Sequence, residues 1–257
     1  MTLKRSSWSL PYLVFLILFV VIPLGLILVY AFLDGSGHFT LSNITKFFED
    51  KDSLATFAVS LEIAIENTLI CLLLGYPVAW ILTNKKLNRS AVIIILFILP
   101  MWINALMRTL ATAELFTMLG FHLGKGTLLY GMVYDYLPFM IYPIYNVLQK
   151  MDASYAEAAE DLGATPWKVF WKVTVPLSKP GIVSGIMMVF MPTVSTFAIS
   201  EFLTNNKIKL FGTIIQEKIY GSMWNYGAAL ALIMLIIIGV TSFFTEKDNN
   251  STEGAII

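Results

Sequence analysis

Long apolar segments alternate with short polar stretches along almost the whole of this sequence. The apolar segments run over residues 10–33, 59–83, 91–113, 126–149, 180–203 and 223–245. A helix needs about 20 apolar residues to cross the hydrocarbon core of a bilayer. The pattern therefore predicts an all-α, polytopic membrane protein with about six transmembrane helices.

Prolines interrupt several of these segments. They are Pro23, Pro77, Pro100, Pro138, Pro143 and Pro192. A proline breaks a soluble helix, but neighbouring helices in a membrane bundle can satisfy the carbonyl groups that it frees. We therefore expect kinked spans at these positions. The first segment, 10–33, is too long for the apolar core of a cleaved signal peptide, so we interpret it as an uncleaved span.

The composition narrows the class of protein further. Of the 257 residues, 57% are hydrophobic and 13% are charged, whereas ordinary soluble domains are about 25% charged. A formal net charge of zero argues against nucleic acid as a partner. Cys71 is the single cysteine and can form no intrachain disulfide, while His38 and His122 are far apart and have no cysteine partners. No metal and no cofactor are expected.

Basic residues are divided unequally between the two sets of connecting loops. One set contains Lys4, Arg5, Lys85, Lys86, Arg89, Lys150, Lys168, Lys172, Lys179 and Lys247. The other set contains Lys46, Lys51, Lys125, Lys207, Lys209 and Lys218. Since cytoplasmic loops carry the excess of Lys and Arg, we expect both termini and the loop at about 150–179 to be cytoplasmic.

The loop at about 150–179 has the pattern of two short helices. Ser154 followed by Glu157 fits a capping box at the start of the first helix. Gly163 suits the left-handed position that ends a helix. Residues at helical spacing place on one face of this helix Tyr155, Ala158, Ala159 and Leu162.

A second loop helix is predicted to begin at Thr165 and Pro166, with the threonine as N-cap, and to end before Pro176. The alanines of the first helix permit close approach to a partner protein. The alternative is an amphipathic helix lying on the bilayer, but such helices usually carry basic residues on the polar face. The first helix carries instead Glu157, Glu160 and Asp161.

Acidic residues lie in or beside the outer halves of the predicted spans, and in this topology only Arg108 opposes them nearby. The acids are Glu62, Glu66, Glu114, Asp135 and Glu201. A charge at the bilayer centre costs at least about 2.5–3.5 kcal/mol, so unpaired carboxylates do not persist against lipid. These acids therefore either line a water-filled cavity or pair within the bundle. An acid-rich outer cavity suits a cation entering from outside.

Two stripes of residues are candidates for a cation pathway. One face of the fourth predicted span carries Asp135, Phe139 and Tyr142. The fifth predicted span carries Thr193, Phe197, Ser200 and Glu201. A carboxylate beside aromatic rings suits an ammonium group through ion pairing and cation–π attraction. Trp102 either lines the pathway or is an ordinary bundle aromatic, and Asp135 and Glu201 either contact substrate or form structural pairs with Arg108 or with a lysine of another subunit.

Residues 157–176 resemble the EAA loop of ABC-importer permeases, whose first helix docks on the ATPase. Glu157, Ala158, Ala159 and Gly163 match the motif, and Pro176 matches the proline that closes the loop. The resemblance implies a type I importer permease fold, with residues 1–257 forming a single permease domain. The residues that it implies for ATPase coupling are Tyr155, Glu157, Ala158, Ala159, Leu162 and Gly163.

Further segments look like the spermidine/putrescine permeases, and specifically like the first of their two paralogous membrane subunits. These segments are residues 71–80, 99–109, 131–145, 180–185 and 191–202. The resemblance implies an importer of polyamines in the bacterial plasma membrane. The partners that it implies are a paralogous permease, two ATPase subunits and an extracytoplasmic polyamine-binding protein. The stretch between Arg108 and Gly131 looks shorter than in these permeases.

The same resemblance implies that the chain is no enzyme and that ATP is hydrolysed on a separate subunit. Its nearest phosphate-loop look-alike, 120–127, has three residues between Gly120 and Gly124 where a Walker loop has four. An alternative cargo is another small cation, an amine or a metal chelate. A membrane-embedded enzyme is disfavoured because no nucleophile–base or metal-ligand constellation is present. A passive channel would have no use for an ATPase-docking loop.

Overall fold

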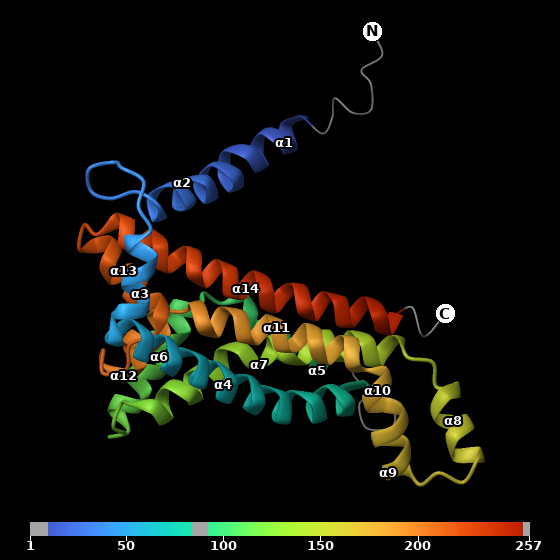
Figure 1. The fold of residues 1–257 in the computed structure, drawn as a ribbon. Coiled ribbons are helices and arrows are strands. Elements are labelled where there is room, and N and C mark those ends of the chain that lie inside the picture. Colours follow the sequence, from blue (N-terminus) through green and yellow to red (C-terminus); the bar gives the residue numbers. More distant parts are fainter. Residues whose placement is uncertain (1–9, 84–91, 254–257) are drawn as a thin grey trace.

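The computed structural model describes residues 10–83 and 92–253. In this part of the chain the regular structure is helical, apart from one isolated antiparallel bridge between Leu33 and Phe39. The longest helices run roughly side by side (Figure 1). The predicted all-α fold is confirmed.

Three helices pack against one another at the centre of the bundle. They are α4 (Lys51–Thr83), α7 (Lys125–Lys150) and α11 (Lys179–Ser195). Met140 and Val189 are fully buried in their shared core. A Cβ added at Gly181 would lie 2.9 Å from the carbonyl oxygen of Pro143. Glycine at this position therefore permits the close approach of α11 to α7.

By length and composition, the described residues contain three helices that can cross a membrane. They are Pro11–Ala31, Lys51–Thr83 and Trp224–Phe243. Two bent helix pairs raise the number to five if each pair forms one span. The segment predicted at 126–149 is α7, which lies at the bundle centre but falls outside this count. Each predicted apolar segment is helical, although two of them are broken.

The first broken segment is 91–113, for which the apolar pattern predicts one continuous span. It forms α5 (Val92–Ile98), a 3₁₀ turn η3 (Leu99–Trp102) and α6 (Ala105–Met118), with 96° between the two arms. Pro100 lies in the turn, and the Asn104 side chain caps α6 by accepting the Leu106 N–H at 2.9 Å. Because proline donates no hydrogen bond and asparagine favours a helix start, the expected kink becomes a sharp bend.

The second broken segment is 180–203. Here α11 ends at Ser195, and α12 (Ala198–Thr204) begins after Thr196, whose backbone is extended. Proline does not end a helix at the remaining central positions. Helices α4, α7 and α11 continue past Pro77, Pro138, Pro143 and Pro192.

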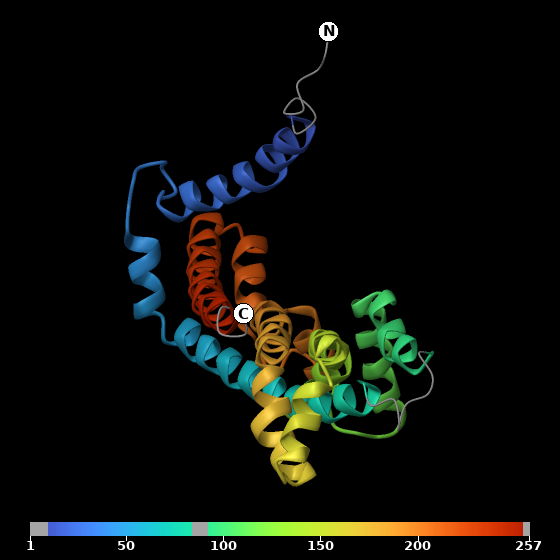
Figure 2. The ribbon, with the colours of Figure 1, turned by 90° about the vertical axis from the view of Figure 1, so that its right-hand side faces the viewer.

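The first apolar segment leaves the bundle. It consists of α1 (Leu10–Leu16), a π-helical turn η2 (Ile17–Val21) and α2 (Ile22–Ala31). The last turn of α2 packs against α14 (Trp224–Glu253), where Ala31 contacts Ala228 and Ala229. The remainder splays away from α14 (Figures 1 and 2), and its apolar side chains face outward, with Phe19 67% exposed.

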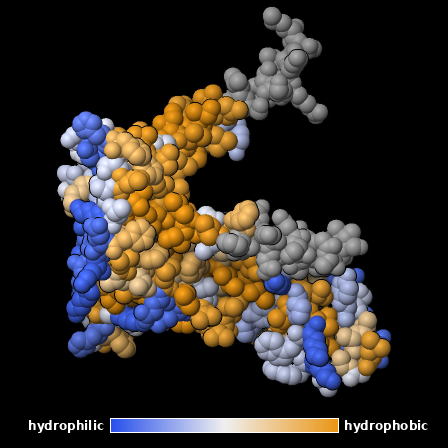
Figure 3. Space-filling model, viewed as in Figure 1, coloured by the Kyte–Doolittle hydropathy of each residue, from blue (hydrophilic) through white to orange (hydrophobic). Residues whose placement is uncertain are grey.

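The two ends of the bundle carry short helices. At the α13 end lie α3 (Ser42–Glu49), α12 and α13 (Phe211–Tyr220). At the α8 end lie α8 (Ser154–Asp161), α9 (Pro166–Val169), the π-helical turn η4 (Phe170–Thr174) and α10 (Val175–Leu177). Figure 3 shows a hydrophobic band between these ends, which is the distribution that a bilayer-embedded bundle requires.

Candidate functional site

The first loop helix forms as predicted but begins differently. Its N-cap is Ala153, which makes no side-chain cap. The backbone N–H of Ser154 donates to Asp152 Oδ1 at 3.0 Å. Hydrogen bonds from the backbone and then the side chain of Ser154 hold the pKa of Asp152 below its usual range. The predicted capping box of Ser154 and Glu157 is therefore wrong, because the upstream aspartate already satisfies this end of the helix.

Helix α8 projects from the bundle (Figure 1), and none of its residues is buried. On the predicted docking face, Tyr155 is 49% and Leu162 is 89% exposed. Ala158 is also exposed, and Ala159 is half-buried. α8 packs against α9 and η4. An apolar face with small residues is thus available to another protein.

Gly163 ends α8 in the left-handed conformation that the sequence predicts. Its φ angle is +81°, and its N–H donates to the Glu160 carbonyl oxygen at 2.8 Å. The Ala164 N–H donates to the Ala159 carbonyl oxygen at 3.0 Å, which completes the helix end. Space around Gly163 is open, so glycine is required here by the backbone conformation and not by crowding.

The second loop helix starts where the sequence predicts and extends further. Thr165 Oγ1 accepts the Lys168 N–H at 3.4 Å, and Pro166 is the first helical residue. The predicted end before Pro176 is wrong, because the helical path continues through η4 and α10 to Leu177. Pro176 is tolerated because it falls in the first turn of α10, after the π turn, where its missing N–H costs little.

A hydrogen bond ties the loop to the bundle core at Ser178. This residue separates Pro166–Leu177 from α11, and the two helical segments meet at 63°. The hydroxyl groups of Ser178 and Tyr76 lie 2.9 Å apart, and both residues are buried. Tyr76 belongs to α4, so a displacement of the loop reaches two core helices through this point.

An ion pair joins the bent helix α6 to α7. Arg108 Nη2 lies 3.1 Å from Asp135 Oδ1, and the side chains are 6% and 2% exposed. Thr109 Oγ1 donates to Asp135 Oδ2 at 3.0 Å. The Arg108 guanidinium carbon lies 5.6 Å from the centroid of the Tyr134 ring. Of the two expectations for Asp135, the structure therefore contains the structural pair with Arg108.

The other residues of the predicted stripe on α7 become progressively more accessible. Phe139 is half-buried, and Tyr142 is 44% exposed beside a small apolar pocket that also involves Phe97 of α5. Trp102 is 85% exposed in the 3₁₀ turn between α5 and α6. These aromatic side chains lie on the outside of this chain.

The predicted stripe on the fifth span is wrong as a single helix face, because the helix breaks between Thr193 and Phe197. Thr193 and Ser200 are fully buried. Phe197 is 42% exposed and lines an apolar cavity of about 530 Å³ between α2, α13 and α14. Glu201 is half-buried in the first turn of α12.

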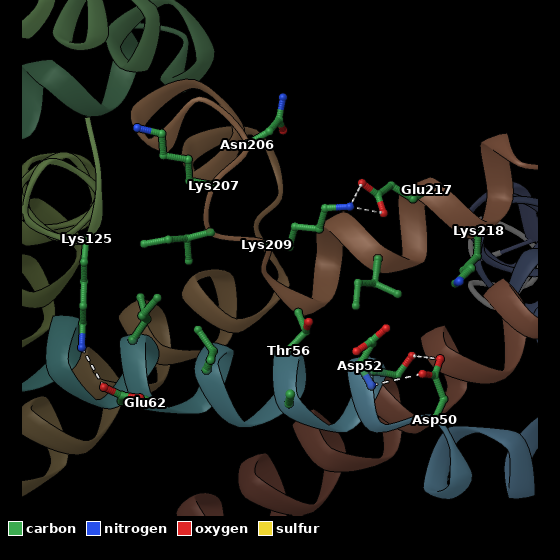
Figure 4. A pocket seen from close by; sticks show the side chains of 16 residues that line it. Asp50, Asp52, Thr56, Glu62, Lys125, Asn206, Lys207, Lys209, Glu217 and Lys218 are labelled. Atoms are coloured by element: carbon green, nitrogen blue, oxygen red, sulfur yellow. Dashed lines mark hydrogen bonds and ion pairs between the residues drawn. The ribbon is translucent and has the colours of Figure 1, made fainter. Parts of the chain in front are cut away.

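A charged cavity of about 790 Å³ opens at the α13 end. Figure 4 shows charged side chains facing it from α4, from the start of α7, from the loop after α12 and from α13. Its acids are Asp50, Asp52, Glu62 and Glu217. Its lysines are Lys125, Lys207, Lys209 and Lys218. The cavity thus carries both signs of charge.

The expectation that only Arg108 opposes the outer acids is wrong. Lys125 Nζ lies 2.7 Å from Glu62 Oε1 and 2.8 Å from Glu66 Oε1. These three residues come from α4 and from the first residue of α7, which are far apart in sequence. The pairing brings a basic residue into what the sequence predicts to be an acid-rich opening.

Sequence reasoning missed a buried polar contact in the core. Asn67 Nδ2 donates to Thr193 Oγ1 at 2.9 Å, and both side chains are fully buried. The signal was present, because Asn67 is the single Asn or Gln of the apolar segment 59–83. A buried amide requires a partner, and this bond fixes α4 against α11.

Known proteins resemble this chain over most of its length. A family described as "Binding-protein-dependent transport system inner membrane component" matches residues 5–246. The spermidine/putrescine transport system permease protein PotB of Escherichia coli is 32% identical, with 88% of this chain and 90% of that protein covered. PotB of Haemophilus influenzae is 30% identical, with 91% and 90% covered.

A solved structure supports the same assignment at the level of fold. A chain of a bacterial ABC transporter for the import of the acidic polysaccharide alginate superimposes with a TM-score of 0.70. The identity is 18%, and the alignment covers 96% of this chain and 99% of that chain. This chain therefore belongs to the inner-membrane components of binding-protein-dependent transport systems, the multi-pass permease family of ABC importers.

Proposed function

We propose that this chain is a permease subunit of an ATP-driven importer of polyamines. The observation that carries the proposal is the similarity to two spermidine/putrescine permeases, at 30% and 32% identity over about nine tenths of each chain. The structural relative imports an acidic polysaccharide and supports the fold alone. We therefore infer the cargo from the sequence relatives and the ATP-driven transport cycle from the family.

The proposed ATPase partner docks on α8. Its support is the combination of a protruding helix, an exposed Leu162 and a left-handed glycine that holds the following helix at a fixed angle. ATP hydrolysis takes place on that separate subunit. This assignment makes the α8 end cytoplasmic and the α13 end extracytoplasmic, with both termini on the cytoplasmic side.

A paralogous permease partner covers the splayed first span. Segment α1–α2 carries apolar side chains away from its own bundle, including the exposed Phe15 and Phe19. Such a helix gains packing from a neighbouring subunit that its own chain does not supply. The proposed binding protein approaches the α13 end, where the charged cavity opens.

The proposed substrate pathway lies between the two permeases. Trp102, Phe139, Tyr142, Phe197 and Glu201 are accessible or half-buried in this chain and contribute side chains to it. The residues placed behind this surface as support are Asp135, Thr193 and Ser200, which are buried. An ammonium group passing this wall meets aromatic rings, which attract cations, and the carboxylate of Glu201.

Substrate-stimulated ATP hydrolysis tests the cargo. The full importer, with its partner permease, ATPases and binding protein, is reconstituted in nanodiscs and given spermidine, putrescine, methionine or an alginate oligosaccharide. We expect stimulation by a polyamine and none by the other two. Stimulation by methionine or by the alginate oligosaccharide, with no response to either polyamine, contradicts the proposed cargo. Glu201→Gln should raise the polyamine concentration for half-maximal stimulation roughly tenfold, as for the loss of one charged hydrogen bond.

A further inference from the structure

Tryptophan side chains gather where the second loop helix meets α4. Trp167 stacks on Phe170 with 6.1 Å between ring centroids, and Trp171 meets Phe170 edge-on at 5.2 Å. Trp80 of α4 lies 5.7 Å from the same ring. Trp167, Trp171 and Trp80 are 70%, 53% and 37% exposed. Three indole rings thus surround one half-buried phenylalanine on the outside of the bundle.

The position of this cluster along the bundle coincides with a membrane surface. Trp80 lies three residues before the end of α4 at Thr83, and α4 is long and apolar enough to cross a membrane. Tryptophan near the end of a span marks the boundary between lipid and water. Helix Pro166–Leu177 is bent by 63° from the helix that follows it. With α11 crossing the bilayer, the bent helix lies closer to the membrane plane than to the normal.

The charges of the two loop helices have opposite sign. Lys168 and Lys172 share a face of Pro166–Leu177, are exposed, and make no ion pair within the described part of the chain. The exposed acids of α8 are Glu157, Glu160 and Asp161. A negative membrane surface therefore attracts the second helix and repels the first.

We propose that helix Pro166–Leu177 is an interfacial helix that binds anionic phospholipid of the cytoplasmic leaflet. Trp167 and Trp171 enter the headgroup and acyl-chain boundary, and Lys168 and Lys172 contact lipid phosphates. The acidic α8 stays off the membrane and faces the ATPase. Membrane charge then sets the resting position of the coupling helix. The inference takes the cytoplasmic side from the proposed function but requires no particular cargo.

Quenching of tryptophan fluorescence by brominated lipids tests this binding. The purified full chain is placed in nanodiscs that contain brominated phosphatidylglycerol or brominated phosphatidylcholine in a background of unbrominated lipid. The signal of Trp167 and Trp171 is taken as the difference between the wild type and Trp167→Phe/Trp171→Phe, which keeps aromatic rings against Phe170. We expect stronger quenching of this signal by the anionic lipid.

Lysine substitutions separate specific binding from general exposure to lipid. Lys168→Gln/Lys172→Gln should reduce the preference for phosphatidylglycerol roughly thirtyfold, since each lysine near an anionic surface contributes about fivefold. The matched control is Lys51→Gln/Lys207→Gln, two exposed lysines at the α13 end, which should leave the preference unchanged.

Three outcomes overturn the proposal. They are equal quenching by both lipids, equal loss of the preference in the control variant, and quenching that disappears when the ATPase subunits are added. The last result would assign this face to the ATPase. Because the measurement involves no transport, it can fail while polyamine uptake is intact, and polyamine uptake can fail while the lipid preference persists.

Discussion

Neutralising Asp135 tests whether the ion pair between α6 and α7 is primarily structural. Asp135→Asn leaves Arg108 charged in a site where its side chain is 6% exposed. The guanidinium Nε and Nη1 already lack hydrogen-bond partners within the described residues. The Thr109 hydroxyl can still donate to an asparagine oxygen, so the main loss is the counter-charge of Arg108.

The expected cost follows from that loss. Removing one partner of a buried ion pair destabilises a protein by about 3–5 kcal/mol. The Tyr134 ring near Arg108 offers a cation–π contact worth about 2 kcal/mol for a desolvated cation, but this contact is already present and does not replace the lost counter-charge. For a chain of this size, each kcal/mol changes the melting temperature by roughly 2–4 °C, so the variant should melt roughly 6–20 °C lower.

The chain contains its own reporter for this measurement. Cys71 is the single cysteine and is fully buried in the core, so a thiol-reactive dye reports unfolding of the purified protein. Arg108→Gln/Asp135→Asn removes both charges and should regain more than half of the lost melting temperature. The matched control is Glu114→Gln, which neutralises an exposed acid on α6, the helix of Arg108. This control should not change the melting temperature.

Two results would refute this account of the pair. One is an Asp135→Asn variant whose melting temperature equals that of the wild type. The other is a double variant that melts as low as the single variant. If Asp135→Asn does not accumulate in the membrane, the amount of folded double variant becomes the readout. Failure of the double variant to accumulate would then also refute this account of the pair.

Three further predictions concern coupling and orientation. Gly163→Pro, which cannot adopt a φ of +81°, should abolish uptake and ATPase association while the chain still inserts; normal transport by the variant would remove the docking hypothesis. In a Cys71→Ser background, an impermeant thiol reagent should label Lys207→Cys but not Lys168→Cys in intact cells; the reverse pattern would invert the topology. Tyr76→Phe removes the hydroxyl group that hydrogen-bonds Ser178 and should lower the free energy of unfolding by about 0.5–1.5 kcal/mol. It should also lower the amount of substrate transported per ATP hydrolysed, an effect that a purely local role in packing would not produce.

Local sequence signals predict much of this fold. Apolar segments of spanning length mark the helices, and the conformational demands of Gly163 and of the Thr165–Pro166 pair mark the loop between the two short helices. These features depend on a few neighbouring residues, and the backbone obeys the same rules in any context. The part of the candidate site that matches the prediction, the shape of the loop at about 150–179, is therefore predictable.

Contacts between distant residues are not predictable in the same way. Arg108 and Asp135 are 27 positions apart in the sequence, and Asn67 and Thr193 are 126 positions apart. Their pairing depends on how the helices pack, which a single sequence does not specify. Helix breaks are only partly predictable. Pro100 and Asn104 together indicate the break in segment 91–113, but a proline alone does not distinguish a bend from a helix that continues.

Pro176 shows how one local change can reverse a sound expectation. A proline in a helix interior normally ends it. The π turn before it shifts the hydrogen-bonding pattern, so Pro176 falls in the first turn of a new α-helical segment. No residue type in the loop predicts the π-helical turn η4 from the sequence alone.

In the proposed function, ATP hydrolysis on a partner subunit drives polyamine through this permease. Accumulation of labelled spermidine or putrescine in proteoliposomes that contain the full importer and its binding protein tests this claim most directly. With ATP supplied on the α8 side, we expect the internal concentration of one of them to exceed the external one, and Gly163→Pro to prevent this. Equilibration of label without ATP, or no uptake of either polyamine by an importer whose ATPase is active, would contradict the account.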